Sequence, residues 1–173
     1  MNFISPELEA ATINQQVDKV TNEYARPDVH VADDGIDSPW IVYLEGIHIR
    51  YTMFDVRQGN WGLMLKTDGP AELGRHKHRS PVSGVTLAGS WGYREYDWVA
   101  RPGSYIHESP GAIHTLYCDD PAGMQAYFNM TGTIEYFDAG DNIIETQDIF
   151  YAINLYLKHC EKNGLAVNKG LFR

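Results

Sequence analysis

The chain has 173 residues, a formal net charge of −9 at pH 7 and 43% apolar residues. This length suits one domain with a substantial core, and the negative charge makes nucleic acid or an anionic membrane an unfavourable partner. The N-terminus lacks a basic, apolar leader, and no apolar stretch is long enough to span a membrane, so we expect a cytoplasmic protein. Two cysteines, Cys118 and Cys160, are too few for a disulfide framework, although one bridge between them stays open.

Residues 1–37 predict an N-terminal arm that is partly helical and partly irregular. Ser5 can cap a helix and Pro6 suits its first position. Apolar residues from Ile13 to Tyr24 then recur at helical spacing. The segment from Pro27 to Pro39 is rich in Pro, Asp and Gly and predicts irregular structure.

Residues 38–145 predict a β-barrel, because short β-branched and aromatic runs alternate with turn signals. The predicted strands are Trp40–Leu44, Ile47–Phe54, Trp61–Lys66, Val82–Leu87, Ser90–Trp98, Gly103–His107, Ile113–Cys118, Gln125–Met130 and Thr133–Phe137. Residues 146–173 predict a C-terminal helix and tail, with a cap at Thr146, Asp148 in the first turn and an end at Gly164. The three segments form one domain overall.

His76 and His78 form an H-x-H pair, the pattern that most directly suggests a metal site. On a strand, alternate side chains share one face, so both imidazoles point the same way and can hold one ion. His114, which follows a Pro-Gly turn and opens a strand, is the best third ligand. His107 is its rival, but His107 and Glu108 point to opposite faces if that strand continues. The remaining histidines, His30, His48 and His159, are expected at the surface or in the core.

These segments resemble the two signature motifs of the cupin family. The run from His76 to Gly89 is similar to the first motif, and Gly103 with Gly111-x-x-His114 is similar to the second. The sequence departs from the family pattern in three places: Pro110 directly precedes Gly111, Cys118 replaces a frequent Asn, and Val82 or Ser83 replaces the usual carboxylate ligand. The resemblance implies an all-β, jelly-roll barrel of the three-histidine cupin subgroup, with an N-terminal arm and a C-terminal helix.

Three longer runs narrow the resemblance to one family within the cupins. They are Thr86–Glu95, Trp98–Tyr105 and Glu108–Leu116. Together they resemble the 2,4′-dihydroxyacetophenone dioxygenase family, over most of the chain from about Ser38 onward. That family implies a non-haem Fe(II) enzyme that uses O₂ to cleave an aryl α-hydroxyketone into 4-hydroxybenzoate and formate. It implies His76, His78 and His114 as metal ligands. Because histidine sites accept several divalent ions, Zn²⁺ is another candidate occupant of the isolated protein.

Within this hypothesis, Glu108 is the first candidate for the proton acceptor, ahead of metal-bound hydroxide, and a purely structural carboxylate is the alternative. Trp91, Tyr93 and Tyr105 are candidates for enclosing the substrate's aromatic ring, and most aromatic residues of a barrel are simply core. Arg79 is a candidate partner for a phenolate or carboxylate, with a surface role as its alternative.

Two other functions stay open at this point. One is a three-histidine cupin oxygenase that cleaves β-diketones. The other is a non-enzymatic, zinc-binding cupin sensor, because three histidines with an open position also suit Zn²⁺. We expect a small aromatic ketone and O₂ as partners, and a homo-oligomer, dimer or tetramer, because small barrels often pair through arms and edge strands.

Overall fold

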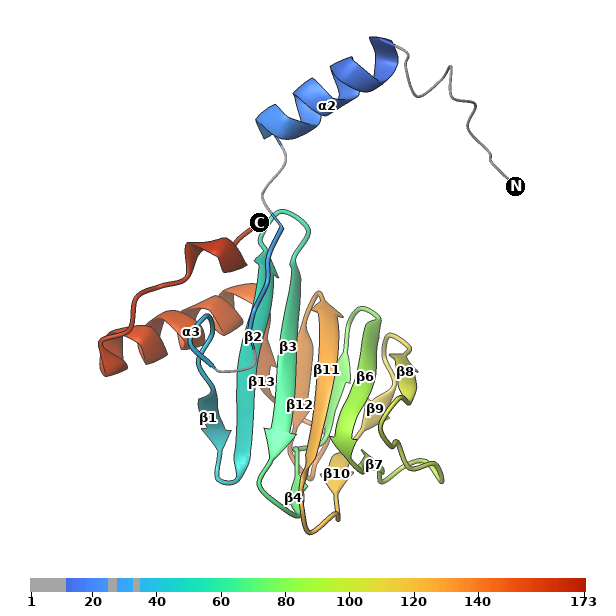
Figure 1. Cartoon of the computed structure of the whole chain (residues 1–173). Helices are drawn as coiled ribbons and strands as arrows, with labels where there is room; N and C mark the ends of the chain where they lie inside the picture. Colours follow the sequence, from blue (N-terminus) through green and yellow to red (C-terminus); the bar gives the residue numbers. More distant parts are fainter. Residues whose placement is uncertain (1–11, 25–27, 33–34) are drawn as a thin grey trace.

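The computed structural model of this chain describes residues 12–24, 28–32 and 35–173. Its dominant feature is a pair of antiparallel sheets, with β12 and β13 lying behind β2, β3 and β11 (Figure 1). The larger sheet has the order β1 (Ile41–Leu44), β2 (Ile47–Asp55), β3 (Asn60–Thr67), β11 (Met124–Thr131), β6 (Val82–Gly89) and β8 (Tyr105–Glu108). The predicted all-β barrel is therefore confirmed.

The second sheet has four strands, in the order β13 (Ile143–Gln147), β12 (Ile134–Phe137), β5 (His76–His78) and β9 (Ile113–His114). A small third sheet has the order β4 (Ala71–Glu72), β10 (Leu116–Cys118) and β7 (Gly92–Tyr93). Side chains alternate between the two faces of each strand, as in β11, where buried and half-buried residues follow each other along all eight positions. The buried faces of both main sheets enclose the core.

The sheets differ from the prediction in several places. The predicted strand Ile113–Cys118 is divided into β9 and β10, which belong to different sheets, and the short strand β4 was not predicted. The predicted strand Ser90–Trp98 is reduced to β7, because the chain turns after Tyr93 and the Tyr96 backbone N–H donates to the Tyr93 carbonyl at 3.1 Å. Strand β13 was not predicted, and it crosses the boundary expected between residues 145 and 146. Its first four side chains are exposed, so it lacks the alternation that reveals a half-buried strand.

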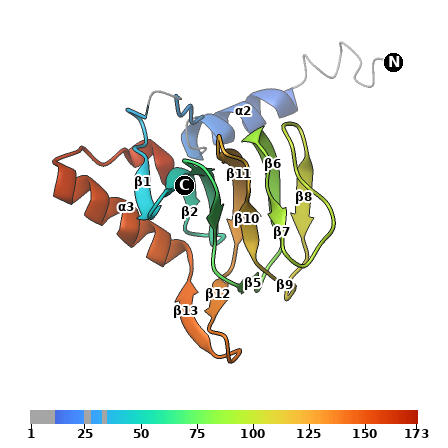
Figure 2. The same cartoon turned by 90° about the horizontal axis from the view of Figure 1, so that it is seen from below.

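Helix α3 (Ile149–Asn163) lies beside the sheets near β1 and β2 (Figure 2). It begins one position after Asp148, whose carboxylate accepts a hydrogen bond from the Tyr151 backbone N–H at 2.9 Å. The predicted cap at Thr146 is wrong, because Thr146 belongs to β13 and is already paired with Glu135. Gly164 ends the helix with φ of 65°, as predicted.

The C-terminal tail folds back onto the larger sheet. After the short 3₁₀ helix η1 (Lys169–Leu171), the Arg173 backbone N–H donates to the Phe54 carbonyl at 2.8 Å. The Phe172 ring packs against the Phe54 ring with centroids 5.2 Å apart. Cys118 and Cys160 are both buried free thiols, so no bridge joins them.

Helix α2 (Thr12–Tyr24) confirms the helix that the spacing of apolar residues predicted in the arm. The predicted cap Ser5 and first helical position Pro6 lie outside the described residues. The helix stands apart from the sheets in Figure 1, and Val17, Val20 and Tyr24 are exposed. None of the helices in the described part of the chain is long and apolar enough to cross a membrane.

Candidate metal centre

His76, His78 and His114 come together on the inner face of the second sheet. Strand β5 buries both histidines and turns Lys77 away, as the H-x-H pattern predicts. His114 on β9 is the direct cross-strand partner of His76. One ring nitrogen of each histidine lies within 4.8 Å of those of the other two, and all three residues are buried. Two distant stretches of sequence thus converge on one point.

The Pro-Gly turn before His114 is attached to the strand that carries the other two histidines. The Gly111 backbone N–H donates to the His78 carbonyl at 2.8 Å. Gly111 has φ of 84°, a left-handed conformation that glycine adopts without steric cost. This turn fixes β9 against β5 and so sets the position of the third imidazole.

The His76 ring is held in a form that leaves one nitrogen available. Its Nδ1 lies 2.7 Å from the Gly74 carbonyl oxygen, which can only accept, so Nδ1 carries the proton and Nε2 keeps a free lone pair. Burial, reinforced by the neighbouring His114 and His78, lowers the pKa of His76 to about 3. At neutral pH the ring is therefore uncharged, which is the form that binds a metal.

Glu108 faces the histidine cluster from β8 of the larger sheet. Its Oε2 lies 3.1 Å from His78 Nε2 and 3.3 Å from His114 Nε2. Although burial alone raises the pKa of this carboxyl, the contacts with His114 and His78 outweigh burial and lower it. His107, the rival third ligand, is exposed on the other face of the same strand.

Tyr93 connects Glu108 to the histidine cluster. Its ring stacks on the His114 ring with centroids 4.0 Å apart, and its hydroxyl donates a hydrogen bond to Glu108 Oε1. Burial, together with the nearby Glu108 carboxylate, raises the pKa of Tyr93 well above its ordinary value. The phenol therefore remains a neutral donor that fixes the carboxylate.

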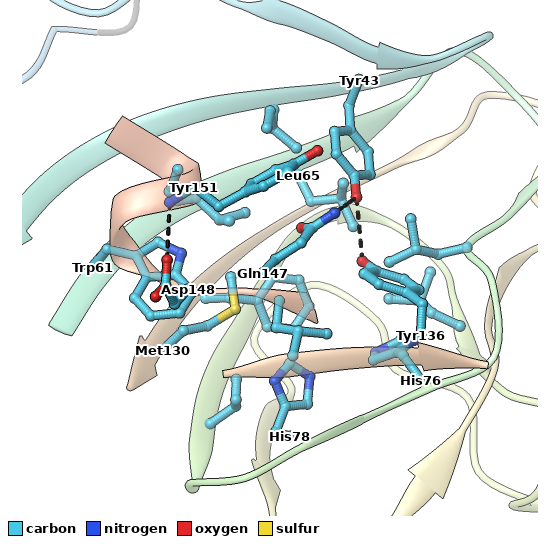
Figure 3. A pocket seen from close by; sticks show the side chains of 18 of the residues that line it. Tyr43, Trp61, Leu65, His76, His78, Met130, Tyr136, Gln147, Asp148 and Tyr151 are labelled. Carbon is cyan, nitrogen blue, oxygen red and sulfur yellow. Dashed lines mark hydrogen bonds between the residues drawn. The ribbon is translucent and has the colours of Figure 1, made fainter. Parts of the chain in front are cut away.

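A cavity between the two sheets begins at this cluster (Figure 3). His76, His78, Glu108 and Tyr93 contribute to one part of its wall, and most of the remainder is aliphatic or aromatic. The wall also contains Tyr43, Tyr136 and Gln147, and the Tyr136 ring lies 5.4 Å from the ring of His76. Sequence reasoning missed these three, because they come from separate strands whose register the sequence does not reveal.

Three residues expected around the substrate are not among those that line this cavity. Trp91 is buried and donates from Nε1 to the Thr86 hydroxyl at 2.9 Å. Tyr105 is 66% exposed on β8. Arg79 directs its guanidinium to Glu135 at 2.7 Å. Of the four proposed pocket residues, Tyr93 alone lies in the wall.

The donor set fits a divalent metal ion. His114 Nε2 and Glu108 Oε2 are buried and have no hydrogen bond of acceptable geometry to another described residue, despite their short separation. Buried polar atoms without partners are uncommon, and an ion held by the three imidazoles would give His114 Nε2 a partner beside the Glu108 carboxylate. Neutral imidazoles suit Fe²⁺ and Zn²⁺ alike.

Comparison with known proteins agrees with this arrangement. A family described as the ChrR cupin-like domain matches residues 29–135. The chain belongs to this cupin family. An RmlC-like cupin protein from Ralstonia eutropha JMP134 is 30% identical, with a TM-score of 0.72 over 80% of this chain and 91% of the other. The jelly-roll cupin barrel expected from the sequence is therefore confirmed.

Two further cupin structures share the fold at lower identity. A protein with a cupin-like fold from the same Ralstonia strain is 20% identical, with a TM-score of 0.69 over 82% of this chain and 93% of the other. An acetylacetone dioxygenase from Acinetobacter johnsonii is also 20% identical, with a TM-score of 0.68 over 78% and 93%. No curated protein matches the sequence.

Proposed function

We propose that this cupin is a non-haem Fe(II) dioxygenase that cleaves the C–C bond of an aryl α-hydroxyketone such as 2,4′-dihydroxyacetophenone. The observation that carries the proposal is the buried three-histidine cluster, with Glu108 facing two of its nitrogens. The mostly apolar cavity beside it suits an aromatic ketone. The motif resemblance and the fold shared with an acetylacetone dioxygenase support the same class of chemistry.

In this proposal His76, His78 and His114 hold the metal through neutral imidazoles. Bound Fe²⁺ would supply O₂ activation and would acidify the α-hydroxyl of a ketone that it chelates. Because the three imidazoles carry no charge, they do not neutralise the ion, whose positive charge would help to stabilise an anionic substrate.

Glu108 is the proposed proton acceptor. The carboxyl is ionised at neutral pH because its pKa is lowered, and Oε2 points to the cluster where the substrate's α-hydroxyl would bind. The Tyr93 hydroxyl holds the other oxygen, so Glu108 cannot rotate freely. The apolar side chains of the cavity exclude water from the reacting atoms.

The reaction balances without another co-substrate. The bond between the ketone carbon and the hydroxymethyl carbon breaks, and one atom of O₂ enters each product. 2,4′-Dihydroxyacetophenone and O₂ thereby give 4-hydroxybenzoate and formate. A β-diketone-cleaving cupin would share the histidines and differ in its cavity.

The direct test loads metal-free protein anaerobically with Fe²⁺ and then supplies 2,4′-dihydroxyacetophenone and O₂. We expect equal amounts of O₂ consumed, 4-hydroxybenzoate and formate, with one ¹⁸O from labelled O₂ in each acid. Acetylacetone, tested in parallel, should be a poor substrate. Absence of O₂ uptake by fully iron-loaded protein, or a clear preference for acetylacetone, would overturn the proposal.

A further inference from the structure

Tyr43, Tyr136 and Gln147, here called the hydroxyl cluster, form a second polar site in the wall of the same cavity. Gln147 Nε2 donates to the Tyr43 hydroxyl oxygen at 2.6 Å, and the Tyr43 hydroxyl lies 3.4 Å from that of Tyr136 (Figure 3). The cluster links β1, an edge strand of the larger sheet, to β12 and the edge strand β13 of the second sheet.

The register of the second sheet relates this cluster to the metal centre. Tyr136 is the cross-strand partner of His76, and their rings lie 5.4 Å apart. Gln147 and His78 are both cross-strand partners of Ile134, on its two sides. Two strand spacings, about 10 Å, therefore separate the backbone that carries Gln147 from the backbone that carries His76 and His78, with Tyr136 on the strand between them. All four residues line the same cavity.

The hydrogen bonds of the cluster have a direction. The Gln147 amide donates to Tyr43, so the Tyr43 hydroxyl can donate onward to Tyr136. The Tyr136 proton then remains for a ligand. Burial raises the pKa of Tyr43 and, together with the contact to Tyr43, raises that of Tyr136 well above its ordinary value, so both phenols are neutral. Among the described residues, no donor reaches the side-chain carbonyl oxygen of Gln147, which can accept.

No cationic side chain lines this cavity among the described residues, whereas the carboxylates of Glu108 and Asp148 do. A ligand with a negatively charged group at this end of the cavity would be repelled by these carboxylates. No cation would compensate the cost of removing that charge from water. A neutral hydroxyl both donates and accepts, which is what the free Tyr136 proton and the free Gln147 oxygen require.

We propose that the hydroxyl cluster binds the distal hydroxyl of a neutral phenolic ketone whose carbonyl end lies at the histidines. The inference rests on the proposed function for the orientation of the substrate, and it names Tyr43, Tyr136 and Gln147 as specificity residues. They position the ring by hydrogen bonds and take no part in the reaction itself.

Calorimetric binding of 4-hydroxyacetophenone and of acetophenone to the zinc-loaded full chain tests this inference without turnover. Neither ketone has an α-hydroxyl and zinc is redox-inert, so failure of the dioxygenase assay leaves this test intact. We expect the wild type to bind the phenol roughly tenfold more tightly, as one or two neutral hydrogen bonds allow.

Tyr43→Phe and Tyr136→Phe should each reduce this preference to about twofold or less, with acetophenone affinity almost unchanged. Gln147→Leu provides a third variant if either substitution impairs folding. Tyr127→Phe is the matched control, because Tyr127 lies outside the cavity wall and the preference should survive. Equal affinity for both ketones in the wild type, no binding of either, or an unchanged preference in the cluster variants would overturn the inference.

Discussion

The ring of Tyr93 stacks on the ring of His114. Their centroids lie 4.0 Å apart, and the angle between the ring planes is 12°. The hydroxyl of the same tyrosine donates a hydrogen bond to Glu108, which faces the Nε2 atoms of His78 and His114. One side chain from β7 thus fixes both a candidate metal ligand and the candidate proton acceptor. Substitutions of Tyr93 and Glu108 therefore test the site as well as substitutions of the histidines do.

Tyr93→Phe keeps the stacked ring and removes the donor to Glu108. Residues that hydrogen-bond around a metal site orient its ligands, and their loss usually reduces metal affinity or activity about 10–100-fold. We therefore expect a loss of this size in metal affinity or in kcat/KM. Metal titration and steady-state kinetics measure the two effects separately. Tyr96→Phe, at a neighbouring and 44% exposed tyrosine, should behave as wild type. Wild-type affinity and kinetics in Tyr93→Phe would show that this hydrogen bond has no role.

Glu108→Gln preserves the shape of the side chain and removes its charge. If Glu108 accepts the substrate proton, kcat/KM for 2,4′-dihydroxyacetophenone should fall by about 100-fold or more, with one metal ion still bound. His107→Gln on the exposed face of the same strand is the control and should retain activity. Full activity would remove Glu108 from the chemistry. Loss of the ion together with activity would make it a ligand instead.

The buried state of His76 predicts how the stability of the metal-free protein depends on pH. Burial, with His114 and His78, lowers the pKa of His76 to about 3 in the folded protein, whereas the unfolded chain has the ordinary value of about 6.5. Below pH 6.5 the unfolded chain therefore binds the proton first, and stability falls as pH decreases. The lowered pKa of Glu108 acts in the same direction below its ordinary value.

We expect the free energy of unfolding to decrease by up to about 1.4 kcal/mol per pH unit between about pH 6 and pH 4. Urea unfolding of chelator-treated protein at several pH values measures this slope. His76→Gln should flatten it, and His30→Gln, at an exposed position, should leave it unchanged. A stability that does not change from pH 7 to pH 4 would contradict the buried, neutral imidazole.

Much of the fold was predictable from local patterns. Runs of β-branched and aromatic residues between turn signals identified strands such as β2, β3, β6 and β11, and the H-x-H pair correctly placed two histidines on one buried face. Strand β13 and the turn after Tyr93 escaped prediction, because β13 is largely exposed and the turn interrupts a β-like sequence. Local propensity does not include such tertiary effects.

The site was predictable where it depends on motifs and unpredictable where it depends on register. The convergence of His114 with His76 and His78 matches the expectation from the Pro-Gly turn. Tyr136 and Gln147 enter the cavity because β12 pairs with β5 and β13 pairs with β12. Trp91 and Tyr105 could not be assigned to core or surface from sequence, since a one-residue shift moves a strand side chain to the other face.

We propose that three imidazoles from two distant segments, those of His76, His78 and His114, bind one ion. Anaerobic titration of the metal-free protein with Fe²⁺, followed by removal of unbound metal and quantification, measures this most directly. We expect one ion per chain in the wild type and in His107→Ala, and less than one tenth of an ion in His114→Ala. A wild type that retains no metal, or a His114→Ala variant that binds as well as the wild type, would contradict it.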